Sequence, residues 1–414
     1  MNILFISTEI PYPPIGGHRL RTFNILRLLS ENHKIFFIGF VKEKKELRYT
    51  KELQTLCESV DIYFIQKDDF SIPFYWNIIK NLFSQLPYIA LKYYNKDASR
   101  RIREILSEVE IDLVHLDLLP LSIYYSDLNS VPTVLTNHNV ESLRLYRWMQ
   151  VEKNYFIKLF LFYQYFKLRS FEKNRCSKCD KCIVVSHYDE KILKTLCKSD
   201  NFAVIPNGVD IQYFKYSDFP IVENRLIWVG GMSGPYNSDA VDYFLDEILP
   251  LIRMKIPEVE VDFVGGWPTK KLEKKVLENP LIRAHGFVDD IRFYVQQAAV
   301  FIAPIRSGSG TKIKVLNALS LGKAVVTTSI GAEGIEVVPD ESIMIADDPK
   351  EFANKVIYLL KHLDVAKKLG AAGRRVIEKY YDWNIIKKKM DRIYNELKLQ
   401  YNVPVPFDTE NKKR

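Results

Sequence analysis

The chain has 414 residues, against about 100–200 for a typical domain, which predicts two domains. It is 47% hydrophobic and 27% charged, a composition that excludes a largely disordered chain, a collagen-like fibre and a small disulfide scaffold. The net charge of +8 favours anionic partners such as phosphates, nucleotides or acidic lipids, and does not by itself indicate nucleic acid.

The N-terminal segment 1–7 has no basic leader and no cleavage site, and its apolar residues indicate a buried strand. No apolar run approaches the roughly 18–20 residues that span a bilayer. We therefore expect a cytoplasmic protein.

The first half of the chain alternates short apolar strands with helices. Strands are predicted at 2–7, 35–41, 60–66, 111–116, 132–136, 182–186 and 202–205, and helices at 19–30 and 98–109. This alternation is typical of a parallel sheet covered on both faces.

The same pattern restarts after a segment rich in turn signals. Strands are predicted at 225–229, 259–264, 281–287, 300–303, 324–328 and 342–346, and helices at 238–256, 290–298, 313–321, 349–360, 365–380 and 383–397. The predicted fold is α/β with two Rossmann-like domains facing each other across a cleft. We assign 1–206 to the N-terminal domain, 207–223 to a hinge, 224–382 to the C-terminal domain, 383–400 to a final helix and 401–414 to a flexible tail.

The strongest local signal is the loop 304–314, Pro-Ile-Arg-Ser-Gly-Ser-Gly-Thr-Lys-Ile-Lys, which follows a strand and opens a helix. Gly308 and Gly310 allow a ligand to approach the backbone. Arg306, Lys312 and Lys314 place positive charge where it opposes the helix dipole, which indicates a bound anion such as phosphate. The alternative is a solvated basic turn.

Two further features lie at predicted carboxyl ends of strands, where ligands bind in open α/β sheets. Gly16 and Gly17 separate the first strand from its helix and either present N–H groups to a phosphate or form a tight turn. His138 follows the strand 132–136 and either exchanges a proton or hydrogen-bonds a ligand, or has a structural role. His115, inside an apolar strand, is expected in the core.

Metal-ligand patterns are weak in this sequence. Cys176, Cys179 and Cys182 have a spacing that iron–sulfur sites use, but the run leads directly into a predicted strand, so packing is the favoured interpretation. We find no Asp-x-Asp triplet and no His/Glu cluster with metal-ligand spacing. We therefore predict chemistry without a metal.

The segment 153–182 interleaves aromatic residues with lysine and arginine. An amphipathic helix of this kind can rest on an anionic membrane, with its rings inward and its lysines at the headgroups. The alternative is a long helix that packs on the first sheet.

Several ordered motifs resemble those of family 4 (group 1) glycosyltransferases with the GT-B fold. They are Pro13-Pro14-Ile-Gly16-Gly17, Asn137-His138-Asn139-Val140-Glu141, Val184-Val-Ser186, Asn207-Gly208-Val-Asp210, Val229-Gly230-Gly231, Gly286-Phe-Val-Asp289-Asp290 and the run from Gly308 to Val326. The resemblance implies transfer of a sugar from a nucleotide donor, UDP- or GDP-linked, with retention and with neither metal nor cofactor. It also implies that the final helix returns to the N-terminal domain.

The resemblance assigns roles to individual residues. It implies that His138 lies by the donor sugar and, with Lys312, serves catalysis. Gly17, Gly231, Lys312 and Lys314 are expected to contact the diphosphate, and Val288 to lie near the base. With these, the expected donor site comprises Gly16, Arg306, Gly308, Ser309, Gly310 and Asn317.

One departure from the family concerns two acidic residues. The family pattern has Glu, seven residues, then Glu; here these positions are Ser309 and Asn317. Asn317 can hydrogen-bond ribose hydroxyls without charge, while Ser309 removes a contact to the donor sugar. The alternative function is therefore a catalytically silent module that binds a sugar nucleotide or a protein partner.

The acceptor is inferred from the expected surroundings of the protein. We expect a glycan or polyprenyl-linked glycan, as in surface polysaccharide assembly, on a protein that is cytoplasmic or peripheral on the inner face of the cell membrane. Nucleic acid is not an expected partner.

Overall fold

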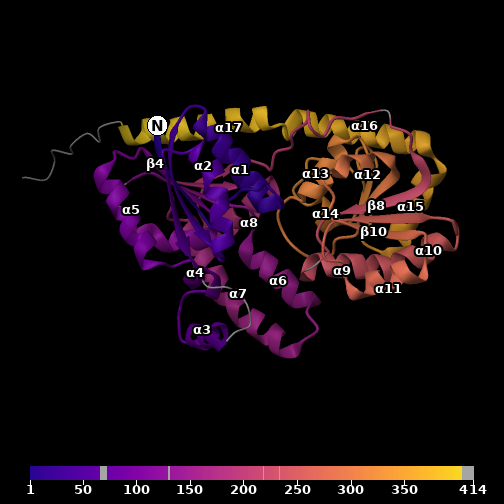
Figure 1. Cartoon of the computed structure of the whole chain (residues 1–414), viewed down its shortest axis with the longest axis horizontal. Helices are drawn as coiled ribbons and strands as arrows, with labels where there is room; N and C mark the ends of the chain where they lie inside the picture. The colour runs from indigo at the N-terminus through magenta and orange to yellow at the C-terminus, as the bar shows by residue number, and fades with distance from the viewer. Residues whose placement is uncertain (66–71, 129–130, 218, 233, 403–414) are drawn as a thin grey trace, which may run out of the picture.

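A computed structural model describes residues 1–65, 72–128, 131–217, 219–232 and 234–402. Figure 1 shows two α/β domains side by side, with the last two helices, in gold and yellow, following one another along one edge of the molecule. Each domain has its own parallel sheet, so the predicted fold class is confirmed.

The first sheet has seven strands in the order β3-β2-β1-β4-β5-β6-β7. Most of its strands are short apolar runs buried on both faces, because helices cover both sides of a parallel sheet. The strands are β1 (Asn2–Ser7), β2 (Lys34–Val41), β3 (Ser59–Phe64), β4 (Leu113–Asp117), β5 (Thr133–Asn137), β6 (Lys181–Val184) and β7 (Phe202–Val204).

Eight α-helices connect these strands within the described part of the first domain. They are α1 (Gly17–Ser30), α2 (Thr50–Gln54), α3 (Ile72–Leu82), α4 (Tyr88–Lys92), α5 (Lys96–Glu108), α6 (Glu141–Val151), α7 (Tyr155–Cys176) and α8 (His187–Cys197). Nowhere in the described ranges is a helix both long and apolar enough to cross a bilayer.

The second sheet has six strands in the order β10-β9-β8-β11-β12-β13. They are β8 (Val222–Val229), β9 (Glu260–Val264), β10 (Ile282–Gly286), β11 (Ala298–Ala303), β12 (Ala324–Thr327) and β13 (Met344–Ile345). Its helices are α9 (Pro235–Tyr243), α10 (Leu249–Arg253), α11 (Lys270–Glu278), α12 (Ile291–Gln297), α13 (Ile313–Ser320), α14 (Ser329–Ala332), α15 (Pro349–Lys361) and α16 (Leu363–Tyr380).

Both sheets reverse their strand order once, between β1 and β4 in the first and between β8 and β11 in the second. Such a switch point opens a crevice at the carboxyl ends of the strands. The glycine pairs after β1 and β8 and the loop after β11 all lie at these two points.

The last helix, α17 (Trp383–Asn402), crosses back to the first domain. Trp383, Ile386, Met390 and Tyr394 are buried in the same core cluster as the residues of β1. Tyr394 also hydrogen-bonds His115 of β4, which is fully buried as expected. The two ends of the chain therefore stabilise one core.

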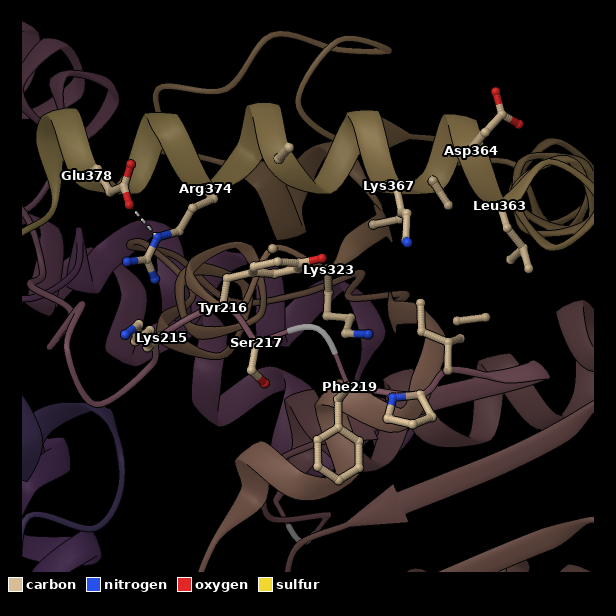
Figure 2. A pocket seen from close by; sticks show the side chains of 17 residues that line it. Lys215, Tyr216, Ser217, Phe219, Lys323, Leu363, Asp364, Lys367, Arg374 and Glu378 are labelled. Carbon is tan, nitrogen blue, oxygen red and sulfur yellow. Dashed lines mark hydrogen bonds and ion pairs between the residues drawn. The ribbon is translucent and has the colours of Figure 1, made fainter.

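The segment that joins the domains is held against α16, beside a cavity of about 1020 Å³ (Figure 2). Arg374 of α16 donates to the carbonyls of Ile211 and Phe214, and the buried Lys323 amine donates to the carbonyls of Gln296 and Ala298. Arg374 therefore ties the connecting segment to α16, and Lys323 ties the end of α12 and the start of β11 to the turn before β12. The lining contains none of the predicted donor-site residues.

One predicted helix is not a single continuous α-helix. The expected continuous helix 238–256 is α9, then a π-helical turn at Phe244–Ile248, then α10. Pro250 lies at the start of α10 and has no N–H to continue an α-helical ladder, so the backbone widens one turn before it.

Other boundaries differ by a few residues. The helix expected within 153–182 ends at Cys176, because a turn and β6 follow, and α17 extends through residues 401–402 of the expected tail. Residues 403–414, residue 66 of the predicted strand 60–66 and residue 218 of the predicted hinge lie outside the described residues. Cys176, Cys179 and Cys182 are buried free thiols at the helix end, in the turn and in β6.

Candidate active site

Three ionisable side chains meet at the carboxyl end of the first sheet. Asp117, the last residue of β4, is fully buried. One of its oxygens lies 2.8 Å from Nε2 of His138, which follows β5. The other lies 3.3 Å from Nε2 of His18 and accepts a hydrogen bond from the Thr22 hydroxyl at 2.6 Å, both from α1. We call His18, Asp117 and His138 the His–Asp–His cluster.

The two histidines of this cluster carry different charges at neutral pH. Burial lowers the pKa of His138 to about 4, despite its contact with Asp117. Burial opposes a charge on His18 too, but hydrogen bonds to Asp117 and to Glu9 (2.8 Å from Nδ1) raise its pKa to about 9. Burial alone would raise the pKa of Asp117, yet His138 and His18 hold it well below its usual range.

The neutral His138 has a defined tautomer. An ionised carboxylate only accepts hydrogen bonds, so Nε2 of His138 must carry the proton that it shares with Asp117. Nδ1 is therefore unprotonated. His138 offers an acceptor for a hydroxyl group, and Asp117 fixes the orientation of its ring.

The second sheet contributes two lysines at the start of α13. Lys314 Nζ donates to Asn237 Oδ1 at 3.0 Å and lies 4.0 Å from the centre of the Trp228 ring. A Cβ added to Gly230, directly after β8, would be 2.7 Å from the same amine. Lys312 Nζ donates to the Gly310 carbonyl at 2.6 Å. The loops after β8 and β11 thus converge on these amines.

Neither lysine has an acidic side chain as its hydrogen-bond partner in the described structure. Burial lowers the pKa of Lys312 to about 8. Burial and the neighbouring Lys312 lower the pKa of Lys314 to about 7. Both amines are therefore close to losing their charge near neutral pH. An anion bound beside them would favour their charged form.

The loop after β11 touches the His138 segment directly. Gly310 has a φ of +69°, and a Cβ there would lie 2.4 Å from the His138 carbonyl oxygen. Ser309 Oγ donates to the Val140 carbonyl at 3.3 Å. On the other side, a Cβ on Gly17 would lie 3.3 Å from Ile313 Cδ1. The fold therefore brings Gly17, His138 and the 308–313 segment together.

An arginine from the first domain holds this contact. Arg147 of α6 donates to the Gly308 carbonyl at 2.6 Å and forms an ion pair with Glu333 at 2.6 Å. Both side chains are largely buried. This pair therefore fixes the relative position of α6 and the glycine loop.

The other predicted site residues have separate surroundings. Gly16 faces open space, and Gly231 packs near the Trp267 ring. Val288 packs partly buried against the second core. Arg306 pairs with Asp239 at 2.6 Å and stacks on Tyr243, so its guanidinium already has partners.

Asn317, in α13, lies in different surroundings from the other predicted site residues. Its Oδ1 is buried and has no hydrogen-bond partner within the described structure.

Sequence reasoning missed His18, Asp117 and Arg147. His18 and Asp117 are 99 residues apart, so no local spacing reveals them. The spacing along the sequence also gave no sign that the three residues of the His–Asp–His cluster each bring one possible ligand atom to within 4.8 Å of the others. The sequence offered one clue, which is where these residues lie relative to the predicted strands. Asp117 ends a strand beside the switch point, and His18 follows the glycine pair.

Comparison with known families agrees with this geometry. Residues 51–213 match the family described as Glycosyltransferase Family 4, and residues 223–362 match Glycosyl transferases group 1. The two matches fall on the two domains in turn. The chain belongs to the family 4 (group 1) glycosyltransferases, with the GT-B fold.

Relatives and solved structures extend this assignment. A Klebsiella pneumoniae protein named "Uncharacterized 44.6 kDa protein in cps region" is 24% identical over 95% of this chain and 99% of its own length. The phosphatidyl-myo-inositol mannosyltransferase of Mycobacterium tuberculosis is 26% identical over 46% of this chain and 53% of its own length.

Two solved structures share the fold at low sequence identity. Sucrose-phosphate synthase from Thermosynechococcus elongatus has a TM-score of 0.71 at 16% identity, covering 97% of this chain and 100% of its own. Anabaena HepE in complex with UDP has a TM-score of 0.63 at 14% identity, covering 96% and 100%.

Proposed function

We propose that this glycosyltransferase moves a sugar from a UDP- or GDP-linked donor to a glycan or lipid-linked glycan acceptor, with retention and without a metal. The observation that carries the proposal is the pair of buried amines, Lys312 and Lys314, at the start of α13 between the two glycine loops. A diphosphate bound there would meet two cations and the free N–H groups of a helix N-terminus.

The same groups account for the chemistry. As the bond from the anomeric carbon to the diphosphate breaks, negative charge develops on the leaving group. Lys312, Lys314 and the N-terminus of α13 are positioned before the reaction to stabilise that charge. Because these cations come from the protein, the proposed transfer needs no metal ion.

His138 is proposed to orient the donor sugar. Its unprotonated Nδ1 can accept a hydrogen bond from a sugar hydroxyl, while Asp117 holds Nε2. The close approach of Gly310 to the His138 segment supports a cleft that closes over the donor, and such closure would exclude water from the reacting atoms. Retention is carried over from the family resemblance.

The acceptor class is supported by the relatives. The Klebsiella relative is named from a cps region, and the mycobacterial relative is named as acting on phosphatidyl-myo-inositol. We therefore favour a glycan or polyprenyl-linked acceptor at the inner face of the cell membrane, and no nucleic acid partner.

Replacement of Lys312 tests the proposed function. We expect Lys312→Ala to lower turnover of the cognate nucleotide sugar at least about tenfold, because one preorganised charge contact contributes that much or more. The folded state should persist, since a desolvated ammonium does not stabilise it. Lys274→Ala, on the exposed surface of α11, is the matched control. Equal turnover of wild type and Lys312→Ala would contradict the assignment.

The silent-module alternative rests on Ser309 and Asn317. NMR of the released sugar from UDP-glucose and GDP-mannose, with EDTA present, separates the two functions. Slow release that starts as the donor's own anomer supports retaining, metal-independent transfer. Nucleotide binding with no release, even with acceptor glycans added, supports the silent module.

A further inference from the structure

Two neighbouring helices of the first domain leave large apolar side chains in solvent. Figure 1 shows α3 and the first half of α7 at the lower edge of that domain. Phe83, directly after α3, is 88% exposed, and Phe156 at the start of α7 is 81% exposed. The α3–α7 surface is defined by the exposed side chains of Trp76, Ile79, Phe83, Phe156, Leu159 and Phe162.

This surface is fixed in place by polar contacts between its helices. Tyr163 donates its hydroxyl hydrogen to the Leu82 carbonyl at 2.6 Å, and Gln164 donates to Asn81 Oδ1 at 2.8 Å. Lys167 Nζ donates to the Asn81 carbonyl at 2.6 Å. The exposed rings therefore belong to a packed unit of two helices.

The charged residues of the two segments that carry these rings are almost all positive, and Asp97 and Glu152 lie just outside the segments. Residues 72–96 contain Lys80, Lys92 and Lys96 and no acidic residue. Residues 153–176 contain six lysines and arginines and a single acidic residue, Glu172. Glu172 is fully buried and accepts hydrogen bonds from the backbone N–H groups of Glu141 and Ser142. The solvent-facing charge of both segments is entirely positive.

We propose that the α3–α7 surface docks on an anionic lipid bilayer. Aromatic and leucine side chains that enter the acyl boundary, with lysines at the level of the headgroups, are the features of an interfacial helix. A second copy of this chain would bring two positive faces together, so charge complementarity favours the bilayer.

The surface is placed to serve the candidate site. Helix α6 begins three residues after His138 and leads to α7. Its 11 residues span about 16 Å at the usual helical rise. A bilayer that holds the start of α7 therefore lies one short helix from the cleft, within reach of a lipid-linked acceptor. The delivery of a lipid-linked acceptor rests on the proposed function, whereas the docking on the bilayer does not.

Vesicle co-sedimentation of the full chain, without donor or acceptor, tests the docking. Phosphatidylcholine vesicles are compared with vesicles containing 30% phosphatidylglycerol, at low and high salt. The wild type should pellet with the anionic vesicles and dissociate at high salt. Phe83→Ser combined with Phe156→Ser should weaken partitioning at least about tenfold. Lys80→Glu with Lys158→Glu should weaken it at least about 25-fold, since each of the two surface cations contributes about fivefold.

Matched controls lie on α11 in the other domain. Leu277→Ser removes a side chain that is 89% exposed, and Lys274→Glu reverses an exposed charge; neither should change pelleting. Thermal unfolding checks that each variant is folded. The proposal is overturned if the wild type stays in solution with anionic vesicles at low salt, or if the paired variants pellet as the wild type does. Light scattering that shows a dimer abolished by the paired phenylalanine variant would also overturn it.

Discussion

At the scale of single residues, Asp117 sets the charge pattern of the candidate site. It is buried between two histidines, and its charge allows His18 to be protonated while His138 stays neutral. We expect Asp117→Asn to lower the free energy of unfolding by roughly 1–3 kcal/mol, because the buried cluster loses its charge-assisted hydrogen bonds while Glu9 still pairs with His18. Denaturant unfolding at pH 7 measures this.

The same variant changes the pH dependence of stability. A raised pKa on His18 stabilises the fold fully below the unfolded value of about 6.5, and this contribution is lost as the pH rises through about 9. Asp117→Asn should flatten that decline and lower the His18 pKa seen by NMR. Glu9→Gln, which removes the second carboxylate partner of His18, should do both to a smaller degree. An unchanged His18 pKa in Asp117→Asn would contradict this account.

The lysines of α13 predict a proton uptake on nucleotide binding. Lys312 and Lys314 have pKa values of about 8 and 7 in the free protein, and a bound diphosphate would raise both. Binding at pH 8 should therefore take up about 1.4 protons, roughly 0.5 at Lys312 and 0.9 at Lys314, and affinity should fall as the pH rises above 7. Calorimetry in buffers of different ionisation enthalpy measures the uptake. A heat that is the same in all buffers would argue against diphosphate contact with these amines.

At the scale of elements, the loop between β11 and α13 is constrained by its contact with the first domain. A side chain at Gly310 meets both a left-handed backbone and the His138 carbonyl. We expect Gly310→Ala to destabilise the protein by about 1–3 kcal/mol and to lower turnover at least about tenfold.

Gly286 supplies the matched control for that substitution. Its φ of +67° is nearly the same, but a Cβ there would meet nothing within 4 Å. Gly286→Ala should therefore report the backbone cost alone in unfolding experiments. If the two substitutions lower the free energy of unfolding equally, the contact with the His138 carbonyl adds nothing to the cost of a side chain at Gly310.

Elements also show what the sequence could predict. The loop 304–314 was predictable because its glycines, its lysines and the adjoining strand and helix are contiguous. Helix α8 was not predicted, although serine is a typical N-cap residue and Ser186 accepts a hydrogen bond from the Asp189 N–H. The His–Asp–His cluster was not predictable by spacing, because only the order of β1, β4 and β5 brings its members together.

At the scale of the whole molecule, the two sheets were predictable from short apolar strands that alternate with helices. The contacts between the domains were not. They depend on a few long-range contacts, such as Arg147 with Glu333 and with the Gly308 carbonyl, that local sequence patterns do not encode. These contacts hold the glycine loop against α6, the helix that begins beside His138.

We expect a nucleoside diphosphate to bind between the domains through the amines of α13. Calorimetric titration of the wild type with UDP, GDP and ADP, in EDTA, tests it most directly. The account predicts selective binding of UDP or GDP, lost or strongly weakened in Lys312→Ala and kept in Lys274→Ala. A folded wild-type protein that binds none of the three nucleotides would contradict it.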